Sequence, residues 1–156
     1  MTASEAIDQS MGANPAYRVT FICSGNICRS PMGEVILKAL VDDTVYADRV
    51  VVDSAGLGSW HVGDGADPRT VRVLAKHGYD ASGHIVQQFK PHWLTERDLI
   101  LAADRGHLRE LTRLAKNRPD EARVDYIRSI DPAAVRAGTL EVDDPWYGSM
   151  ADFERT

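Results

Sequence analysis

A cysteine and an arginine six positions apart are the residues of this sequence best suited to chemistry. Cys23 and Arg29 bracket five residues, and Ser30-Pro31 follows at the expected start of a helix. Five residues at this place can wrap into one turn whose backbone N–H groups point inward and, with the positive end of the helix, cradle a tetrahedral dianion. The planar guanidinium of Arg29 can hold two oxygens of that anion at once. The spacing therefore predicts a phosphate-binding loop that includes Ser24, Gly25, Asn26, Ile27, Cys28 and Ser30.

Cys23 is the candidate nucleophile of this loop. Thiols beside helix N-termini and cations have pKa values that fall from about 8.5 to about 3.5–7.5, so Cys23 is expected to be a thiolate at neutral pH. A lone cysteine at the end of a strand is more commonly a buried structural thiol. The offset of Arg29, the backbone freedom of Gly25 and the strand-to-helix setting favour a catalytic loop, and no Gly-Lys-Ser/Thr follows that would indicate a Walker loop.

Two further loop residues each have two interpretations. Cys28 is either a small residue packed beneath the loop or a redox partner, because an oxidised Cys23 within bonding reach would be trapped as a disulfide. Ser30 is predicted to be the N-cap of a helix with Pro31 at its first position, and its hydroxyl either only caps or also donates to the thiolate.

Asp144 is predicted to be the general acid that protonates the departing oxygen. Two other Asp-Pro pairs, at 67–68 and 131–132, have the pattern of helix caps or turns. Asp144 instead precedes two aromatic residues, Trp146 and Tyr147, which would wall a cleft around an aryl ring. A plain surface turn is the alternative interpretation of this segment.

Alternating strands and helices must position these residues. The pattern predicts strands at 18–22, 49–53, 99–102 and 122–127, and helices at 30–41, from Asp67-Pro68 to before Gly78, and from Asp104 or Arg105 onward. Such alternation is typical of an α/β fold with a mainly parallel sheet, whose ligands bind beyond the carboxyl ends of the strands. The first strand-to-helix loop is therefore the expected site.

The composition predicts a single globular domain. The 156 residues are 44% hydrophobic and 26% charged, which suffices for one core without a disulfide or metal. We expect a disordered polar arm at residues 1–16 and the domain at residues 17–156. No apolar run approaches the roughly 20 residues that cross a bilayer.

Charge and cysteine usage exclude other classes of protein. The net charge of −5, with no run of Lys or Arg, disfavours a nucleic-acid or membrane surface. Two cysteines without an export signal indicate reduced thiols and the cytoplasm. The five histidines and two cysteines have no metal-ligand spacing, so neither a metal nor a cofactor is expected.

Four separated segments together resemble the low-molecular-weight protein tyrosine phosphatases, most closely their actinobacterial branch. The resemblance spans most of residues 18–153 and rests on residues 19–32, Asp-Ser-Ala-Gly at 53–56, Gly-Ser-Trp-His-Val-Gly at 58–63 and Asp-Pro-Trp-Tyr at 144–147. It implies a four-stranded parallel sheet, in the order 2-1-3-4, flanked by helices.

The resemblance also implies an activity: hydrolysis of phosphotyrosine in a protein substrate, through a cysteinyl-phosphate and without a cofactor. Cys23 would be the nucleophile, Arg29 the phosphate clamp and Asp144 the acid and then the base. Phosphate or another oxyanion would bind the same loop.

Supporting residues follow from the same resemblance. Asn26 would hold the loop in shape through a network with Ser54 and His84, although Ser54 could simply end a strand and His84 could be an exposed loop histidine. Trp60 would line the cleft with Tyr147, although a loop tryptophan often only packs.

Three alternative functions fit the sequence less well. Arsenate reductase on the same fold needs cysteines beyond the loop, and none follows Cys28. Phosphoarginine phosphatases carry Thr where this chain has Ile27, whose apolar side chain suits an aryl ring. A silent phosphate-binding module is disfavoured because Cys23, Arg29 and Asp144 are all present. The family pattern continues past residues 152–154 into a final amphipathic helix that covers the sheet. We therefore expect either that this sequence is truncated or that one face of the sheet is covered in another way, because an uncovered face would expose a large apolar patch.

Overall fold

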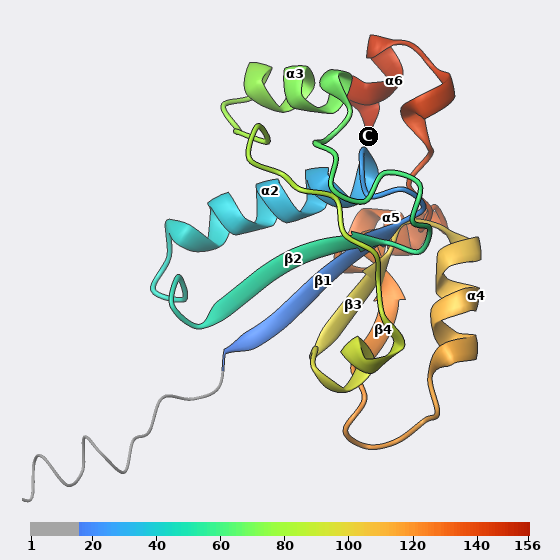
Figure 1. Ribbon diagram of the computed structural model, residues 1–156. Helices are drawn as coiled ribbons and strands as arrows, with labels where there is room; N and C mark the ends of the chain where they lie inside the picture. The colour runs from blue at the N-terminus through green and yellow to red at the C-terminus, as the bar shows by residue number, and fades with distance from the viewer. Residues whose placement is uncertain (1–15) are drawn as a thin grey trace, which may run out of the picture.

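A four-stranded parallel sheet forms the core of the computed structural model, which describes residues 16–156 (Figure 1). The strands lie in the order β2-β1-β3-β4, where β1 is Tyr17–Cys23, β2 is Val50–Gly56, β3 is Leu99–Ala102 and β4 is Arg123–Tyr126. The predicted α/β class, the parallel sheet and the order 2-1-3-4 are confirmed. Except for its last residue, the arm predicted at residues 1–16 lies outside the described residues.

The second strand is longer than the sequence predicted. The predicted strand ends at residue 53, but residues 54–56 continue β2 and pair with β1 as far as Cys23 opposite Gly56. Ser54 is tolerated inside the sheet because its hydroxyl accepts a hydrogen bond from Asn26 Nδ2 and donates one to the Glu34 carboxylate. This extension brings Ser54 close to the edge where Cys23 lies.

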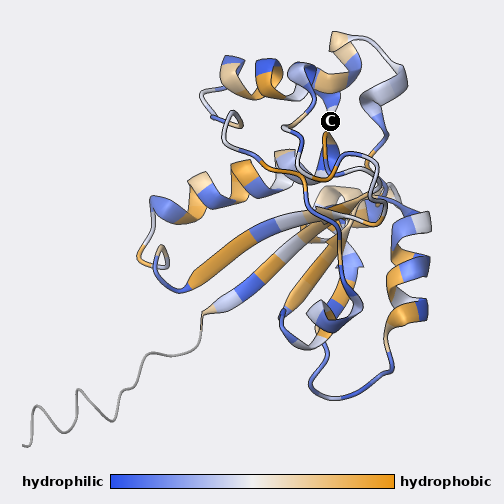
Figure 2. Cartoon of the chain, in the orientation of Figure 1, coloured by the Kyte–Doolittle hydropathy of each residue, from blue (hydrophilic) through white to orange (hydrophobic). Residues whose placement is uncertain are grey.

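Side chains that alternate along the strands bury both faces of the sheet. Phe21 belongs to the apolar cluster on the face covered by α2 (Arg29–Asp42), whereas its neighbour Ile22 belongs to the cluster on the face of α4 (Arg105–Leu114). In Figure 2 the strands are largely hydrophobic, while α4 carries many hydrophilic residues along its length. The sheet is therefore a buried middle layer that fixes the carboxyl ends of β1 and β3.

Two short helices form a smaller layer over the start of α2. Figure 1 shows α3 (Pro68–Lys76) beside α6 (Met150–Arg155), and the two helices are in contact. Phe153 of α6 and Leu74 of α3 pack in one buried cluster with Cys28 of the loop. The loop therefore has an apolar support on this side. Another helix, α5 (Pro132–Ala137), follows β4.

Aspartates begin three of the helices, as the sequence predicted. The carboxylates of Asp67, Asp104 and Asp131 accept hydrogen bonds from backbone N–H groups at the starts of α3, α4 and α5. The prediction of Ser30 as an N-cap is wrong, because α2 begins at Arg29 and its N-cap position is Cys28. Pro31 is still within the first turn, where its missing N–H removes no helix hydrogen bond. The Ser30 hydroxyl therefore has other partners.

An apolar groove of about 240 Å³ lies along α2, between Met32 and Leu40 on one side and Ile127 and Ile130 on the other.

Within residues 16–156, no helix is both long and apolar enough to span a membrane.

Candidate active site

In the loop between β1 and α2, backbone carbonyl groups accept hydrogen bonds from residues outside the loop. Backbone N–H groups of Leu57 and Gly58 donate to the carbonyls of Cys23 and Ser24, and the N–H of Asp67 donates to that of Ile27. The carbonyl of Asn26 accepts from His84 Nε2 at 2.8 Å. With these carbonyls turned outward, the backbone N–H groups of the turn are left to face its centre, as an anion-binding loop requires.

Two residues allow the chain to turn this tightly. Asn26 has a φ of 58°, in the left-handed region that asparagine tolerates better than most residues. Gly56 lies against the loop backbone, and a Cβ there would stand 2.7 Å from the carbonyl oxygen of Ser24. Any larger residue at position 56 would therefore push the loop away from β2.

A directed chain of hydrogen bonds ends at the sulfur of Cys23. The N–H of Gln87 donates to Asn26 Oδ1 at 3.1 Å, which fixes the orientation of the amide and leaves Asn26 Nδ2 as a donor. Nδ2 donates to Ser30 Oγ at 2.8 Å, and Ser30 Oγ lies 2.9 Å from Cys23 Sγ. Either group can donate in this contact, but a thiolate can only accept, so a Cys23 thiolate would take the proton of the Ser30 hydroxyl. Ser30 is thus placed to donate a hydrogen bond to a Cys23 thiolate.

The network predicted around Asn26 is present, with one member that the sequence did not indicate. Asn26 Nδ2 also donates to Ser54 Oγ at 2.9 Å, and His84 holds the Asn26 carbonyl. The side chain of His84 is only 5% exposed, so it is not a free loop histidine. Glu34 is the additional member: it accepts from the Ser54 hydroxyl and lies 3.5 Å from His84 Nδ1. Its position one helical turn after Ser30 is the signal that could have found it.

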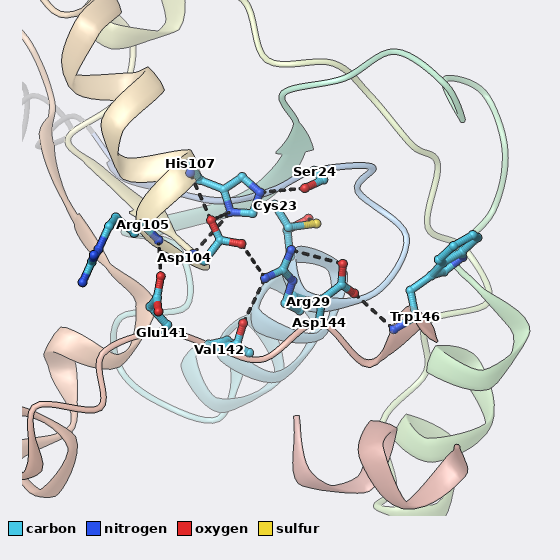
Figure 3. A network of polar contacts seen from close by, with 11 residues as sticks. Cys23, Ser24, Arg29, Asp104, Arg105, His107, Glu141, Val142, Asp144 and Trp146 are labelled. Atoms are coloured by element: carbon cyan, nitrogen blue, oxygen red, sulfur yellow. Dashed lines mark hydrogen bonds and ion pairs between the residues drawn. The ribbon is translucent and has the colours of Figure 1, made fainter. Parts of the chain in front are cut away.

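Arg29 is buried and held in one orientation (Figure 3). Its Nη1 donates to Asp104 Oδ2 and to the carbonyl of Val142, each at 2.9 Å, which uses both protons of that nitrogen. The opposite edge, Nε and Nη2, remains for an anion, and Asp144 Oδ2 lies 3.6 Å from Nη2. The guanidinium therefore offers a two-pronged edge to a phosphate.

Asp104 and His107 are site residues that the sequence analysis missed. Burial raises the pKa of Asp104, but the hydrogen bonds from Arg29 and from the His107 N–H outweigh it and hold this pKa below its usual range. Burial lowers the pKa of His107, so the ring is neutral near pH 7. The Asp104 N–H donates to His107 Nδ1 at 3.3 Å, which leaves Nε2 to donate to Ser24 Oγ at 2.8 Å. These two residues connect the loop to the guanidinium of Arg29.

The loop opens into a cleft of about 370 Å³ that brings together the predicted catalytic and cleft-wall residues, while Asn26, Ser30, Ser54 and His84 support the loop from outside the cleft. Its lining consists of Cys23, Ser24, Gly25, Ile27, Cys28, Arg29, Trp60, His61, Asp144, Trp146 and Tyr147. Trp60 and Tyr147 are 74% and 86% exposed, which leaves their rings available at the mouth. Trp146 and Tyr147 meet edge to face, with ring centroids 4.7 Å apart.

Asp144 has two contacts that set its place at this cleft. Its Oδ1 accepts from the N–H of Trp146 at 3.1 Å and so caps the 3-10 helix Pro145–Tyr147. Its Oδ2 faces Arg29 across the cleft (Figure 3). The segment is a turn, as the alternative interpretation had it, but the turn carries a carboxylate on the wall opposite the Cys23 loop.

Cys28 is buried in an apolar setting. It packs with Met32, Val73 and Phe153, and burial raises the pKa of its thiol to about 12. The thiol is therefore protonated at neutral pH. This packing fits the interpretation of Cys28 as a small residue beneath the loop, and its redox role stays a prediction.

Residues 18–156 match the family model described as low molecular weight phosphotyrosine protein phosphatase. A low molecular weight protein-tyrosine-phosphatase from Streptomyces coelicolor is 52% identical over 138 residues, which cover 88% of this chain and 83% of the relative. A protein tyrosine phosphatase from Entamoeba histolytica superposes with a TM-score of 0.82 at 28% identity, over 90% of this chain and 86% of the other. The arginine phosphatase of Drosophila superposes with a TM-score of 0.78 at 32% identity, over 88% and 86% of the two chains.

Proposed function

The chain belongs to the low molecular weight phosphotyrosine protein phosphatase family and is a protein-tyrosine phosphatase, and we propose that Cys23, Arg29 and Asp144 carry out its hydrolysis of phosphotyrosine. The supporting observation is that the cleft brings a hydrogen-bonded cysteine, the free edge of a fixed arginine and a carboxylate to one ring of backbone N–H groups. Each of the three side chains then has a distinct role in a two-step reaction.

In the first step the phosphoryl group moves from tyrosine to sulfur. The dianion binds in the loop, and Nε and Nη2 of Arg29 hold two of its oxygens as the negative charge spreads over them. The Cys23 thiolate attacks phosphorus, so that an S–P bond forms while the bond from phosphorus to the tyrosine oxygen breaks. Asp144 gives its proton to that oxygen, and tyrosine leaves as a neutral phenol.

In the second step water releases the phosphate. Asp144, now a carboxylate, takes a proton from water as the water oxygen attacks phosphorus, and the S–P bond breaks. The leaving group is the Cys23 thiolate, and the Ser30 hydroxyl that points to this sulfur stabilises it as the charge returns. The enzyme is then back in its starting state with inorganic phosphate in the loop.

The substrate class follows from the walls of the cleft. Ile27, Trp60, Trp146 and Tyr147 present apolar and aromatic surface beside the loop, which suits a flat aryl ring. A phosphotyrosine side chain of a partner protein fits this description better than phosphoserine, which has no ring for these walls. A reducing compartment such as the cytoplasm would keep the thiol of Cys23 active.

Turnover of matched peptides that carry phosphotyrosine, phosphoserine or phosphoarginine tests this proposal. We expect the wild type to release phosphate rapidly from the phosphotyrosine peptide. The Cys23→Ser variant should release none, because it lacks the nucleophile, but it should still bind vanadate because the N–H groups and Arg29 remain. Near-normal turnover by Cys23→Ser would refute the role of this cysteine, and a preference for phosphoarginine would refute the substrate class.

A further inference from the structure

Arg69 lies in the first turn of α3, and the orientation of its guanidinium is fixed by Asp67, the residue that caps the same helix. Its Nε donates to Asp67 Oδ1 at 3.0 Å and its Nη2 donates to Asp67 Oδ2 at 2.9 Å, a two-pronged pair between the planar groups. This pair is also why the pKa of Asp67 lies below its usual range. The remaining nitrogen, Nη1, therefore points in a fixed direction.

That direction leads to the segment that carries Asp144. Nη1 donates to the carbonyl of Trp146 at 3.2 Å. The backbone N–H of Trp146 donates to Asp144 Oδ1, so Arg69 and Asp144 bind the two polar groups of the Trp146 backbone. The guanidinium also lies 4.5 Å from the ring centre of Phe153, which is buried in α6 directly after this segment. Arg69 thus contacts the acid-bearing segment at Trp146 and the helix that follows it at Phe153.

The same few residues of α3 also hold the nucleophile loop. The N–H of Asp67 and the hydroxyl of Thr70 both donate to the carbonyl of Ile27, at 2.9 and 3.0 Å. Ile27 lies in the turn that begins at Cys23. One helix start therefore joins the loop that holds the nucleophile to the segment that holds the carboxylate.

We propose that Arg69 is a positioning residue, which fixes the distance between the Asp144 carboxyl and the phosphoryl group on the Cys23 loop. The inference rests on the proposed function, because it needs Asp144 to be the general acid. Arginine suits the position because its rigid fork can bind Asp67 and still direct Nη1 to Trp146, whereas the single ammonium of lysine has no such geometry. A general acid must lie within hydrogen-bond distance of the leaving oxygen. A displacement of the Asp144 carboxyl by about 1 Å would therefore slow the reaction.

The test compares two leaving groups in the Arg69→Met variant. We expect kcat/KM for phosphotyrosine, which reports the first step, to fall about 10-fold, because the carboxyl is present but misplaced. For dinitrophenyl phosphate, whose phenolate leaves without a proton, we expect kcat/KM to change by about 2-fold at most. In the double variant Arg69→Met/Asp144→Asn, kcat/KM for phosphotyrosine should equal that of Asp144→Asn alone.

Two controls separate positioning from general damage. Glu154→Gln removes the charge from the surface contacts of Glu154 with Lys76 and His77, which also connect α3 to α6, and should leave kcat/KM unchanged for both substrates. Vanadate affinity of Arg69→Met should match the wild type, because the loop contacts of Asp67 and Thr70 remain. Arg69→Lys, which keeps the charge, should show the same dependence on leaving group and provides a second variant if Arg69→Met does not fold.

Equal losses for the two substrates, or losses that add to those of Asp144→Asn, would overturn the positioning role of Arg69. If Asp144→Asn itself shows no dependence on the leaving group, the assignment of the general acid is what fails.

Discussion

The hydrogen bond from Ser30 to Cys23 makes a quantitative prediction about the second chemical step. Ser30→Ala removes a hydroxyl that lies 2.9 Å from the sulfur and can donate to the thiolate. The bond matters most when the thiolate departs from phosphorus, because only then does full negative charge return to sulfur. We therefore expect Ser30→Ala to slow the hydrolysis of the cysteinyl-phosphate more than its formation from the substrate.

The size of this effect follows from the charge on the acceptor. A hydrogen bond to a charged group contributes about 1.5–3 kcal/mol, and each 1.36 kcal/mol changes a rate tenfold. Ser30→Ala should therefore slow release of phosphate from the intermediate by about 10- to 100-fold. Formation of the intermediate should slow much less, because the Cys23 thiolate loses charge in that step.

Stopped-flow release of a chromogenic phenol measures the two steps separately. The variant should show a burst of phenol close to one equivalent per enzyme, followed by slow turnover, and the phosphorylated cysteine should be detectable by mass spectrometry. Ser54→Ala is the matched control, because Ser54 also accepts from Asn26 Nδ2 but does not contact the sulfur. An equal burst in the two variants, or a slow first step in Ser30→Ala, would refute this reasoning.

Three further predictions concern the rest of the site. Asp144→Asn should slow hydrolysis of phosphotyrosine by about 10²–10⁴ and affect an acidic phenol far less, and equal losses across a series of phenyl phosphates would mean a structural role. The folded state holds the pKa of His107 below its unfolded value, so as pH falls below about 6.5 the unfolded chain takes up a proton that the folded one does not. Urea titrations should therefore show the wild type losing more unfolding free energy between pH 7.5 and pH 5.5 than His107→Gln does, and equal losses would contradict the buried neutral ring. Ile27→Thr should raise activity on phosphoarginine relative to phosphotyrosine, and unchanged selectivity would show that this side chain does not choose the substrate.

The fold could be predicted from local sequence patterns because β-rich and helical segments alternate along the whole chain. The errors lie where tertiary contacts replace local preference. Ser54–Gly56 has the composition of a turn, yet it continues β2 because β1 offers it a partner strand. Ser30 has the residue type of an N-cap, yet it lies inside α2 with its hydroxyl directed to Cys23.

Contacts between distant residues explain what the sequence analysis missed in the site. Arg29 and Asp104 are separated by 75 positions, and Ser24 and His107 by 83, so no local motif joins them. Asp104 was identified only as the start of a helix. It follows β3, however, and the carboxyl ends of parallel strands share one edge, so that rule applied to β3 would have indicated both Asp104 and His107.

The two carboxylates around Arg29 stand in different relations to its guanidinium. Asp104 accepts a hydrogen bond from Nη1 at 2.9 Å and so fixes the orientation of the group. Asp144 stands 3.6 Å from Nη2, beyond hydrogen-bond distance, on the edge that a phosphate needs. One carboxylate therefore holds the guanidinium in place, while the other leaves the donors of the opposite edge to an anion.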